Sequence, residues 1–206
     1  MTLQNRVLPT QEIVADPARG TLTGNRGILH RDDRRLGRAR WTHKAWICCT
    51  LDWKGVRRQV MTGRTWTELF FLDEAVALAA GHRPCALCRR AAYTAFRDAW
   101  TAAHGARALA REIDDILHAA RVTPDRRQQR HTAPATDLPD GSFLLHDGAP
   151  HLVMGDGIHP FTPAGYAPPL RRPEGPVTVL TPAPTIRVLA AGYRPQLHQS
   201  ATPGTI

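Results

Sequence analysis

Apolar residues recur at helical spacing in the middle of the chain. Between residues 91 and 104 they fall on one helical face, and Gly105 follows as a stop signal. Residues 107–121 show a second apolar face. The positions are Ala91, Ala92, Ala95, Phe96, Ala99 and Trp100 in the first stretch, and Leu109, Ile113, Ile116 and Leu117 in the second. We therefore predict a central pair of helices.

Short runs of β-branched and aromatic residues, separated by turn residues, predict strands on both sides of this pair. Residues 1–30 look extended, and residues 45–51 and 56–62 predict a hairpin around Gly55. The remaining predicted elements are strands over 67–72, 142–146, 151–154, 158–162 and 177–180, and a short helix over 183–191.

Strands and helices are segregated along the chain rather than alternating, which predicts an α+β fold. It would combine a β-rich N-terminal half, the helical pair and a small C-terminal antiparallel sheet. The expected organisation is a β-rich region over 1–90, helices over 91–123, a polar linker over 124–140, a small β-rich region over 141–198 and a disordered tail over 199–206.

A Cys-x-x-Cys pair, Cys85 and Cys88, follows a proline and a short predicted helix that Gly81 ends. Asp73 is placed to cap the start of that helix. Two thiolates at this spacing, on a tight turn before a helix, form half of a zinc site, because the backbone amides of the turn can donate to the sulfurs. We therefore predict that Cys85 and Cys88 bind Zn²⁺.

The stretch around this pair, about residues 66–90, carries Phe70-Phe71 followed by E-A-x-A-x-x-x-G-x-R-P-C-x-x-C. It resembles the zinc-binding half of the Ada-type methyl-phosphotriester repair domain, a module of bacterial DNA-repair regulators. Upstream, the Gly-Ile and Arg of the family pattern are matched, while His30 and Arg34 stand where the family has cysteines. The resemblance implies zinc and nucleic-acid binding, since histidine binds zinc but does not accept a methyl group as a thiolate does.

The other two metal ligands are predicted from the upstream half. Cys48 and Cys49 are neighbours in a predicted strand, so they face opposite sides and only one is expected to reach the metal. Cys49 or Cys48 supplies the third sulfur, and His30 or His43 the nitrogen. Taking Cys49 and His30 with the Cys-x-x-Cys pair gives a closed Cys₃His site of the structural kind.

The charge indicates a polyanionic partner. Lys and Arg number 27 against 18 Asp and Glu, which gives a net charge of +9, and most of the basic residues are arginines. Guanidinium groups bind phosphate bidentately, so a nucleic acid is expected. The resemblance implies DNA rather than RNA. The predicted contact residues are Arg26, Arg31, Arg34, Arg35, Arg38, Arg40, Arg83, Arg89 and Arg90. No apolar run is long enough for a membrane span, and a cytoplasmic protein is expected.

The leading hypothesis is a zinc-containing nucleic-acid-binding protein in DNA repair or modification. The alternatives are an enzyme acting on DNA, either a nuclease or an alkyl-transfer protein using Cys48 or Cys49, and a zinc-stabilised module that binds protein or a small anion. Glu112, Asp115 and His118 are neighbours on the second helix and could hold a nuclease metal. The Pro-Cys-x-x-Cys run also matches half of a deaminase signature, but no His-x-Glu accompanies it.

Overall fold

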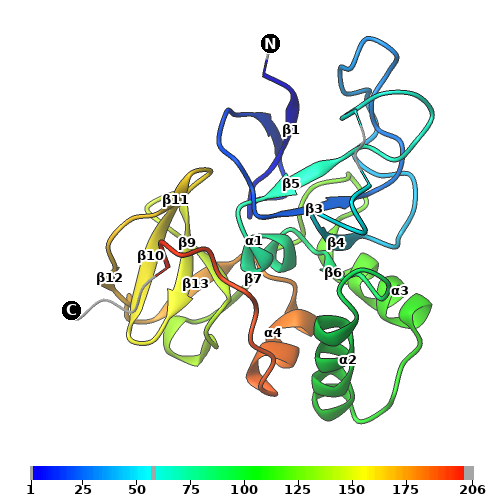
Figure 1. Ribbon diagram of the computed structural model, residues 1–206. Helices are drawn as coiled ribbons and strands as arrows, with labels where there is room; N and C mark the ends of the chain where they lie inside the picture. The colour runs from blue at the N-terminus through cyan, green and yellow to red at the C-terminus, as the bar shows by residue number, and fades with distance from the viewer. Residues whose placement is uncertain (1, 57–58, 202–206) are drawn as a thin grey trace.

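The structure is a computed structural model that describes residues 2–56 and 59–201. Within these residues the chain forms two β-sheets and four α-helices, so the predicted α+β class is confirmed. Figure 1 shows the first sheet, from the N-terminal part of the chain, beside the second, C-terminal sheet, with the helices between and below them. None of the helices in the described part of the chain is long and apolar enough to cross a membrane.

The first sheet has six strands in the order β2-β1-β5-β3-β4-β6. The strands are β1 (Gln4–Val7), β2 (Ile13–Ala15), β3 (Leu22–Asn25), β4 (Ile47–Thr50), β5 (Leu69–Phe71) and β6 (Arg83–Pro84). Strands β1 and β5 pair in parallel, as do β4 and β6, while the other neighbours are antiparallel. The parallel pairing of β4 with β6 brings the Cys-x-x-Cys turn beside the two cysteines of β4.

The second sheet has seven strands, and all of its pairings are antiparallel. The strands are β7 (His131–Pro134), β8 (Phe143–His146), β9 (Ala149–Met154), β10 (Gly157–Thr162), β11 (Gly165–Tyr166), β12 (Leu170–Arg171) and β13 (Pro176–Val179). A 3₁₀ turn, η1 (Ala135–Asp137), follows β7. This arrangement agrees with the small antiparallel sheet expected from the turn-punctuated C-terminal sequence.

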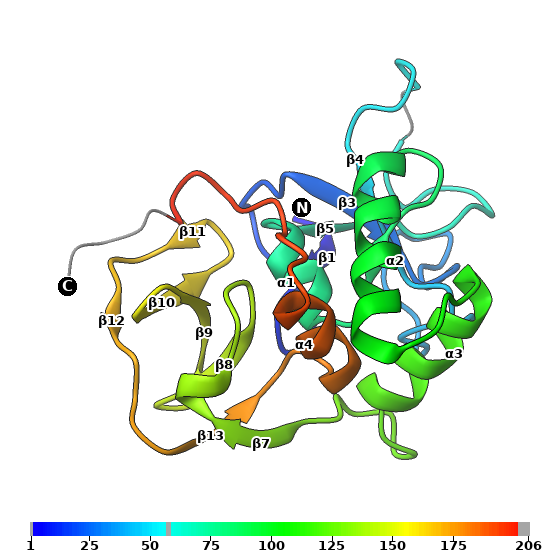
Figure 2. The same ribbon diagram turned by 90° about the horizontal axis from the view of Figure 1, so that it is seen from below.

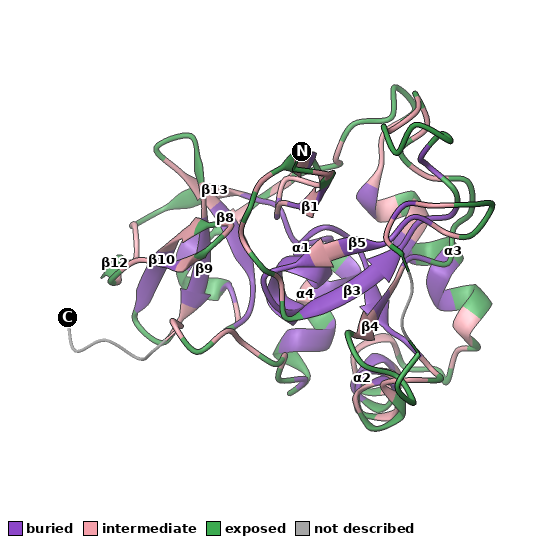
Figure 3. Ribbon diagram, turned by 45° about the horizontal axis from the view of Figure 1, so that its top comes forward, coloured by how far each residue is buried: buried purple, intermediate pink, exposed green. Residues whose placement is uncertain are grey.

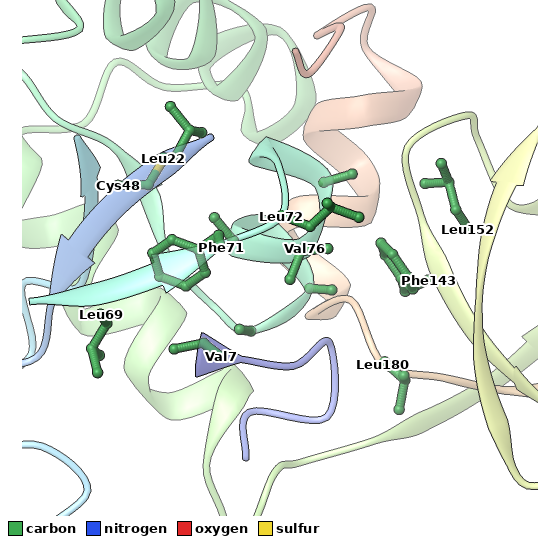
Figure 4. Packing of buried hydrophobic residues seen from close by; sticks show 14 of the residues in the cluster. Val7, Leu22, Cys48, Leu69, Phe71, Leu72, Val76, Phe143, Leu152 and Leu180 are labelled. Atoms are coloured by element: carbon green, nitrogen blue, oxygen red, sulfur yellow. The ribbon is translucent and has the colours of Figure 1, made fainter. Parts of the chain in front are cut away.

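The helices are α1 (Glu74–Ala79), α2 (Arg90–His104), α3 (Ala110–Arg121) and α4 (Ala183–Ala190). Helix α1 is wholly buried, and Asp73 caps it by accepting a hydrogen bond from the Val76 backbone N–H, as predicted. In Figure 4 its residue Val76 lies between Phe71 of the first sheet and Phe143 of the second. One apolar core therefore takes side chains from both sheets.

A second core joins α2, α3 and α4, which Figure 2 shows side by side. It contains Phe96, Trp100, Ile113, Leu117 and Leu189, at the helical spacings that predict these elements. Figure 3 shows the same amphipathic division, with buried faces turned inward and exposed faces outward on α2 and α3. The predicted helices over 91–104, 107–121 and 183–191 are confirmed to within a few residues.

The glycine that ends α1 is required by its surroundings. Gly81 has φ +84°, and a Cβ atom there would lie 2.5 Å from Cδ of Arg121. Gly192 ends α4 in the same way, with φ +103° and a backbone N–H bonded to Leu189. The similar sequences at 78–84 and 189–195 thus share a helix-ending conformation.

Three expectations about local structure need correction or fall outside the described chain. Residues 59–62 contain a turn at 60–61 and not the returning strand of a hairpin, and β4 pairs instead with β3 and β6. The predicted linker contains β7, because its backbone completes the edge of the second sheet against β13. Residues 57–58 and most of the expected tail, 202–206, lie outside the described residues.

Candidate metal centre

Strand β4 places Cys48 and Cys49 on opposite faces of the first sheet, as the alternation of a strand requires. Cys48 is fully buried in the core between the sheets, and Figure 4 shows it next to Leu22. Its sulfur accepts a hydrogen bond of 3.2 Å from Nη1 of Arg89, and burial raises its pKa to about 12. Cys48 is therefore an inert core thiol, while Cys49 is half-buried on the other face.

The Cys-x-x-Cys turn is held against β4 by backbone bonds. Cys48 pairs with Pro84 across the sheet, and the N–H of Cys85 donates to the Cys48 carbonyl at 2.9 Å. The Leu87 N–H donates to Sγ of Cys85 at 3.4 Å, and α2 begins two residues after Cys88. Such N–H···S bonds stabilise thiolates, which is the chemistry expected of this turn.

These elements bring the Sγ atoms of Cys49, Cys85 and Cys88 within 4.8 Å of one another. In a tetrahedral zinc–thiolate site, sulfurs lie about 3.8 Å apart, given a Zn–S bond of about 2.3 Å. The cluster could therefore hold a metal ion with little movement of its side chains. Cys49 and Cys88 are half-buried, and Leu87 between the two turn cysteines is 69% exposed, so the cluster lies at the surface.

The cluster already favours a thiolate at one of its three sulfurs. A hydrogen bond from Cys49 lowers the pKa of Cys85 to about 5, and backbone N–H groups of Cys88 and Leu87 act in the same direction. The same contact raises the pKa of Cys49, and burial raises that of Cys88. Binding of a cation would release the remaining protons, because thiolates rather than thiols ligate metals.

The structure does not bring the two candidate histidines into this cluster. Both ring nitrogens of His30 have other partners, the Thr67 hydroxyl at 2.7 Å and the Gly63 carbonyl at 3.1 Å. His43 contacts the side chain of Asn25 at 3.1 Å. Among the described residues, no histidine, aspartate or glutamate joins the three cysteines. The predicted Cys₃His set is thus a Cys₃ set here, with His30 a buried structural side chain.

Two arginines near the cysteines form ion pairs with buried carboxylates. Arg83 forms two hydrogen bonds of 2.8 Å to Asp114, and Arg89 forms two of 2.8 Å to Glu74. Both pairs are less than a tenth exposed. These two predicted nucleic-acid contacts are therefore internal ion pairs, and Arg90 is the exposed arginine that remains beside the turn.

The other predicted contacts divide into one buried arginine and one exposed group. Arg26 is 1% exposed and lies over the Trp46 ring, with its guanidinium carbon 4.1 Å from the ring centroid. The exposed group is on the long connection between β3 and β4, residues 26–46. Its members are Arg31, Arg34, Arg35, Arg38 and Arg40. Long connections of this kind are commonly functional.

The acidic residues on α3 do not form the second metal site that their spacing allows. Glu112 accepts the Leu109 N–H at the start of the helix, and Asp115 pairs with Lys44 at 2.7 Å. His118 contacts Arg121 instead. The three side chains thus have separate local roles, and the described residues contain no carboxylate cluster that could hold a metal.

Sequence reasoning missed the carboxylates that neutralise the buried arginines. Asp114 is 31 residues from Arg83, and Glu74 is 15 residues from Arg89. The sequence marks Glu74 only as a favourable acid in the first turn of a helix, and nothing near Asp114 distinguishes it from its neighbour Asp115. A scan against protein-family models and searches of curated proteins and of solved structures found no match to this chain. The class of site therefore rests on the cysteine geometry.

Proposed function

We propose that this chain is a zinc-containing protein that binds nucleic acid, with DNA as the preferred partner. The observation that carries the proposal is the convergence of three thiol groups, from β4 and from the turn before α2, within 4.8 Å. Soft thiolate ligands select zinc among the common divalent cations of the cell. Cys49, Cys85 and Cys88 would hold the ion, and a water molecule would take the fourth position.

The metal would join two elements that are otherwise linked by few contacts. Strand β6 is only two residues long, and its pairing with β4 involves Ile47 and Cys48 opposite Arg83 and Pro84. A zinc ion that binds Cys49 together with the cysteines of the turn would cross-link β4 to the turn at this edge of the sheet. Zinc binding of this kind contributes directly to the free energy of folding.

The exposed arginines of the β3–β4 connection support the nucleic-acid part of the proposal. The connection that contains these arginines begins at β3, which pairs with β4. A metal bound at β4 would therefore stabilise the sheet from which this connection starts. Half-exposed Trp41 follows Arg40 directly, and an aromatic ring among guanidinium groups suits phosphate contact combined with base stacking. Gly27 allows the connection to begin close to Thr42, since a Cβ atom there would overlap the Thr42 hydroxyl.

The test is a titration of a labelled duplex, and of single strands of DNA and RNA, with the zinc-loaded full chain across a salt series. Affinity should fall steeply with salt, with a log–log slope of about −0.9 for each duplex phosphate neutralised. The triple variant Arg31→Gln, Arg35→Gln, Arg38→Gln should bind more weakly. Its slope should be shallower by about 0.9 for each phosphate that the variant no longer neutralises.

A matched control comes from exposed arginines on other elements. Arg171 lies on β12 and Arg187 on α4, and both are exposed. The double variant Arg171→Gln, Arg187→Gln changes the net charge in the same sense and should leave most of the slope unchanged. Absence of binding at low salt, or equally weakened binding in both variants, would contradict the proposed surface.

A second candidate function is alkyl transfer to a metal-activated thiolate, favoured by the half-buried position of Cys49 in the cluster. The Cys49 sulfur would form a bond to the methyl carbon of a phosphotriester. The carbon–oxygen bond would break, and its electron pair would leave with the phosphodiester oxygen. Methylated DNA should then add the mass of one CH₂ to the peptide containing Cys49, and an unchanged mass would exclude this candidate.

A further inference from the structure

A pocket rich in arginine lies apart from the cysteine cluster and takes its lining from three segments distant in sequence. We name it the arginine pocket. It has a volume of about 540 Å³ and is formed by the β1–β2 turn, the β3–β4 connection and the segment after α3. Its lining includes Arg26, Arg40, Trp41, Arg126, Arg127 and Arg130. Glu12 is the one carboxylate that lines it, and its Oε2 accepts the Thr10 hydroxyl.

Arg26 is the unusual member of this lining because it is buried without an acidic partner. Its Nε donates to His82 at 3.4 Å and its Nη1 to the Gln11 carbonyl at 3.3 Å, both long bonds. Its Nη2 has no hydrogen-bond partner among the described residues, and no carboxylate there forms an ion pair with it. Burial, with smaller contributions from Arg121 and Arg40, lowers its pKa well below the usual value.

A buried guanidinium in this situation is costly unless a negative group compensates it. The nearby charged groups, Arg121 and Arg40, increase this cost. Arg121 lies against the same Trp46 ring, 3.9 Å from its centroid, and donates to the carbonyls of Gly81 and Lys44. The environment of Arg26 is therefore suited to an anion supplied from the pocket.

The other arginines of the pocket have no buried carboxylate partner. Arg126 has no side-chain hydrogen bond or ion pair among the described residues, and its backbone has φ +66°. Arg127 pairs with the exposed Asp125, and Arg130 donates to Gln128. Five guanidinium groups therefore line the pocket with a single carboxylate among them.

We propose that the arginine pocket binds the phosphate group of a phosphate ester, with the guanidinium group of Arg26 as its buried donor and Arg126 and Arg130 as outer donors. A planar guanidinium matches phosphate geometry and forms short charge-assisted hydrogen bonds with it. Trp41 lines the same pocket. The pocket shares Arg40 and Trp41 with the proposed nucleic-acid surface. The proposal goes beyond that surface, because it needs one phosphate group and none of the exposed residues Arg31, Arg35 or Arg38.

The experiment is calorimetric titration of the full chain, loaded with zinc, with inorganic phosphate, 5′-AMP and adenosine in a phosphate-free buffer. Phosphate and 5′-AMP should bind at the same site and compete, while adenosine should bind far more weakly. Arg26→Met should weaken binding on the order of tenfold or more, because it removes a charge-assisted hydrogen bond. Circular dichroism and thermal melting check that the variant is folded.

If Arg26→Met does not fold, the exposed variant Arg126→Gln provides the test and should weaken phosphate binding by about fivefold. Arg171→Gln on the second sheet is the control and should bind as the wild type does. The proposal is overturned if neither phosphate nor 5′-AMP binds at millimolar concentration, or if both pocket variants bind like the control.

Two sources of the phosphate group are separated by a second arm with oligonucleotides. If the source is a nucleic-acid end, a 5′-phosphorylated strand should bind more tightly than its 5′-hydroxyl form, and 5′-AMP should abolish the difference. If the source is a free ester, the two strands should bind alike while 5′-AMP still binds. Either result supports phosphate binding in the arginine pocket. The triple variant Arg31→Gln, Arg35→Gln, Arg38→Gln should bind 5′-AMP as the wild type does, even if the protein does not bind nucleic acid.

Discussion

The arginines beside the cysteine cluster and the buried arginine of the arginine pocket carry the same charge but have different partners. Arg83 and Arg89 each meet a buried carboxylate through two hydrogen bonds of 2.8 Å. Arg26 is buried just as deeply, yet it has only a histidine nitrogen, a backbone carbonyl and the Trp46 ring. The first two hold the fold together, whereas Arg26 lacks a negative partner within the described chain.

This difference shows why net charge alone does not locate a binding surface. Beside the cysteine cluster, Asp114 and Glu74 neutralise Arg83 and Arg89, so Arg90 is the exposed arginine that remains there. Groups of arginines without a buried carboxylate partner lie on the β3–β4 connection and in the arginine pocket. Two measurements of stability test whether the buried arginines differ in this way.

The largest expected effect is that of Arg83→Met. It would leave the Asp114 carboxylate buried and without its guanidinium, so the free energy of unfolding should fall by about 3–5 kcal/mol. Urea unfolding followed by circular dichroism measures the change. The double variant Arg83→Met, Asp114→Leu should recover much of the loss, and a single variant within about 1 kcal/mol of wild type would show that the pair is not a buried ion pair.

Arg26→Met should have a much smaller effect in the same measurement. It removes two long hydrogen bonds and the contact with Trp46 but leaves no carboxylate unpaired, so the free energy of unfolding should fall by about 1 kcal/mol or less. A decrease as large as that of Arg83→Met would mean that Arg26 is paired within the fold. The pocket would then have no unsatisfied charge to offer to an anion.

Much of the local structure follows from the sequence because its causes are local. The Asp73 cap, the glycine that ends α1 and the apolar faces of α2 and α3 depend on residues within a few positions of one another. The turn of Cys85 and Cys88 is recognisable for the same reason. Strand alternation also predicts that Cys48 and Cys49 face opposite sides of the sheet.

What the sequence leaves open depends on pairings between distant segments. The parallel pairing of β4 with β6 decides which cysteine of β4 joins the cluster. His30 is held away from the cluster by Thr67 and Gly63, which lie more than thirty residues later in the chain. The strand β7 in the predicted linker exists because β13 supplies its partner. Ion pairs such as Arg83 with Asp114 have the same origin, since no periodic pattern joins residues 31 positions apart.

The central claim, a zinc ion held by Cys49, Cys85 and Cys88, is tested most directly by the metal content of two neighbouring variants. Zinc per chain should be measured by elemental analysis on wild type, Cys48→Ala and Cys49→Ser after dialysis. Because Cys48 faces the core and Cys49 faces the cluster, wild type and Cys48→Ala should each retain one equivalent while Cys49→Ser loses most of it. Zinc absent from wild type, or retained equally by both variants, would contradict the account.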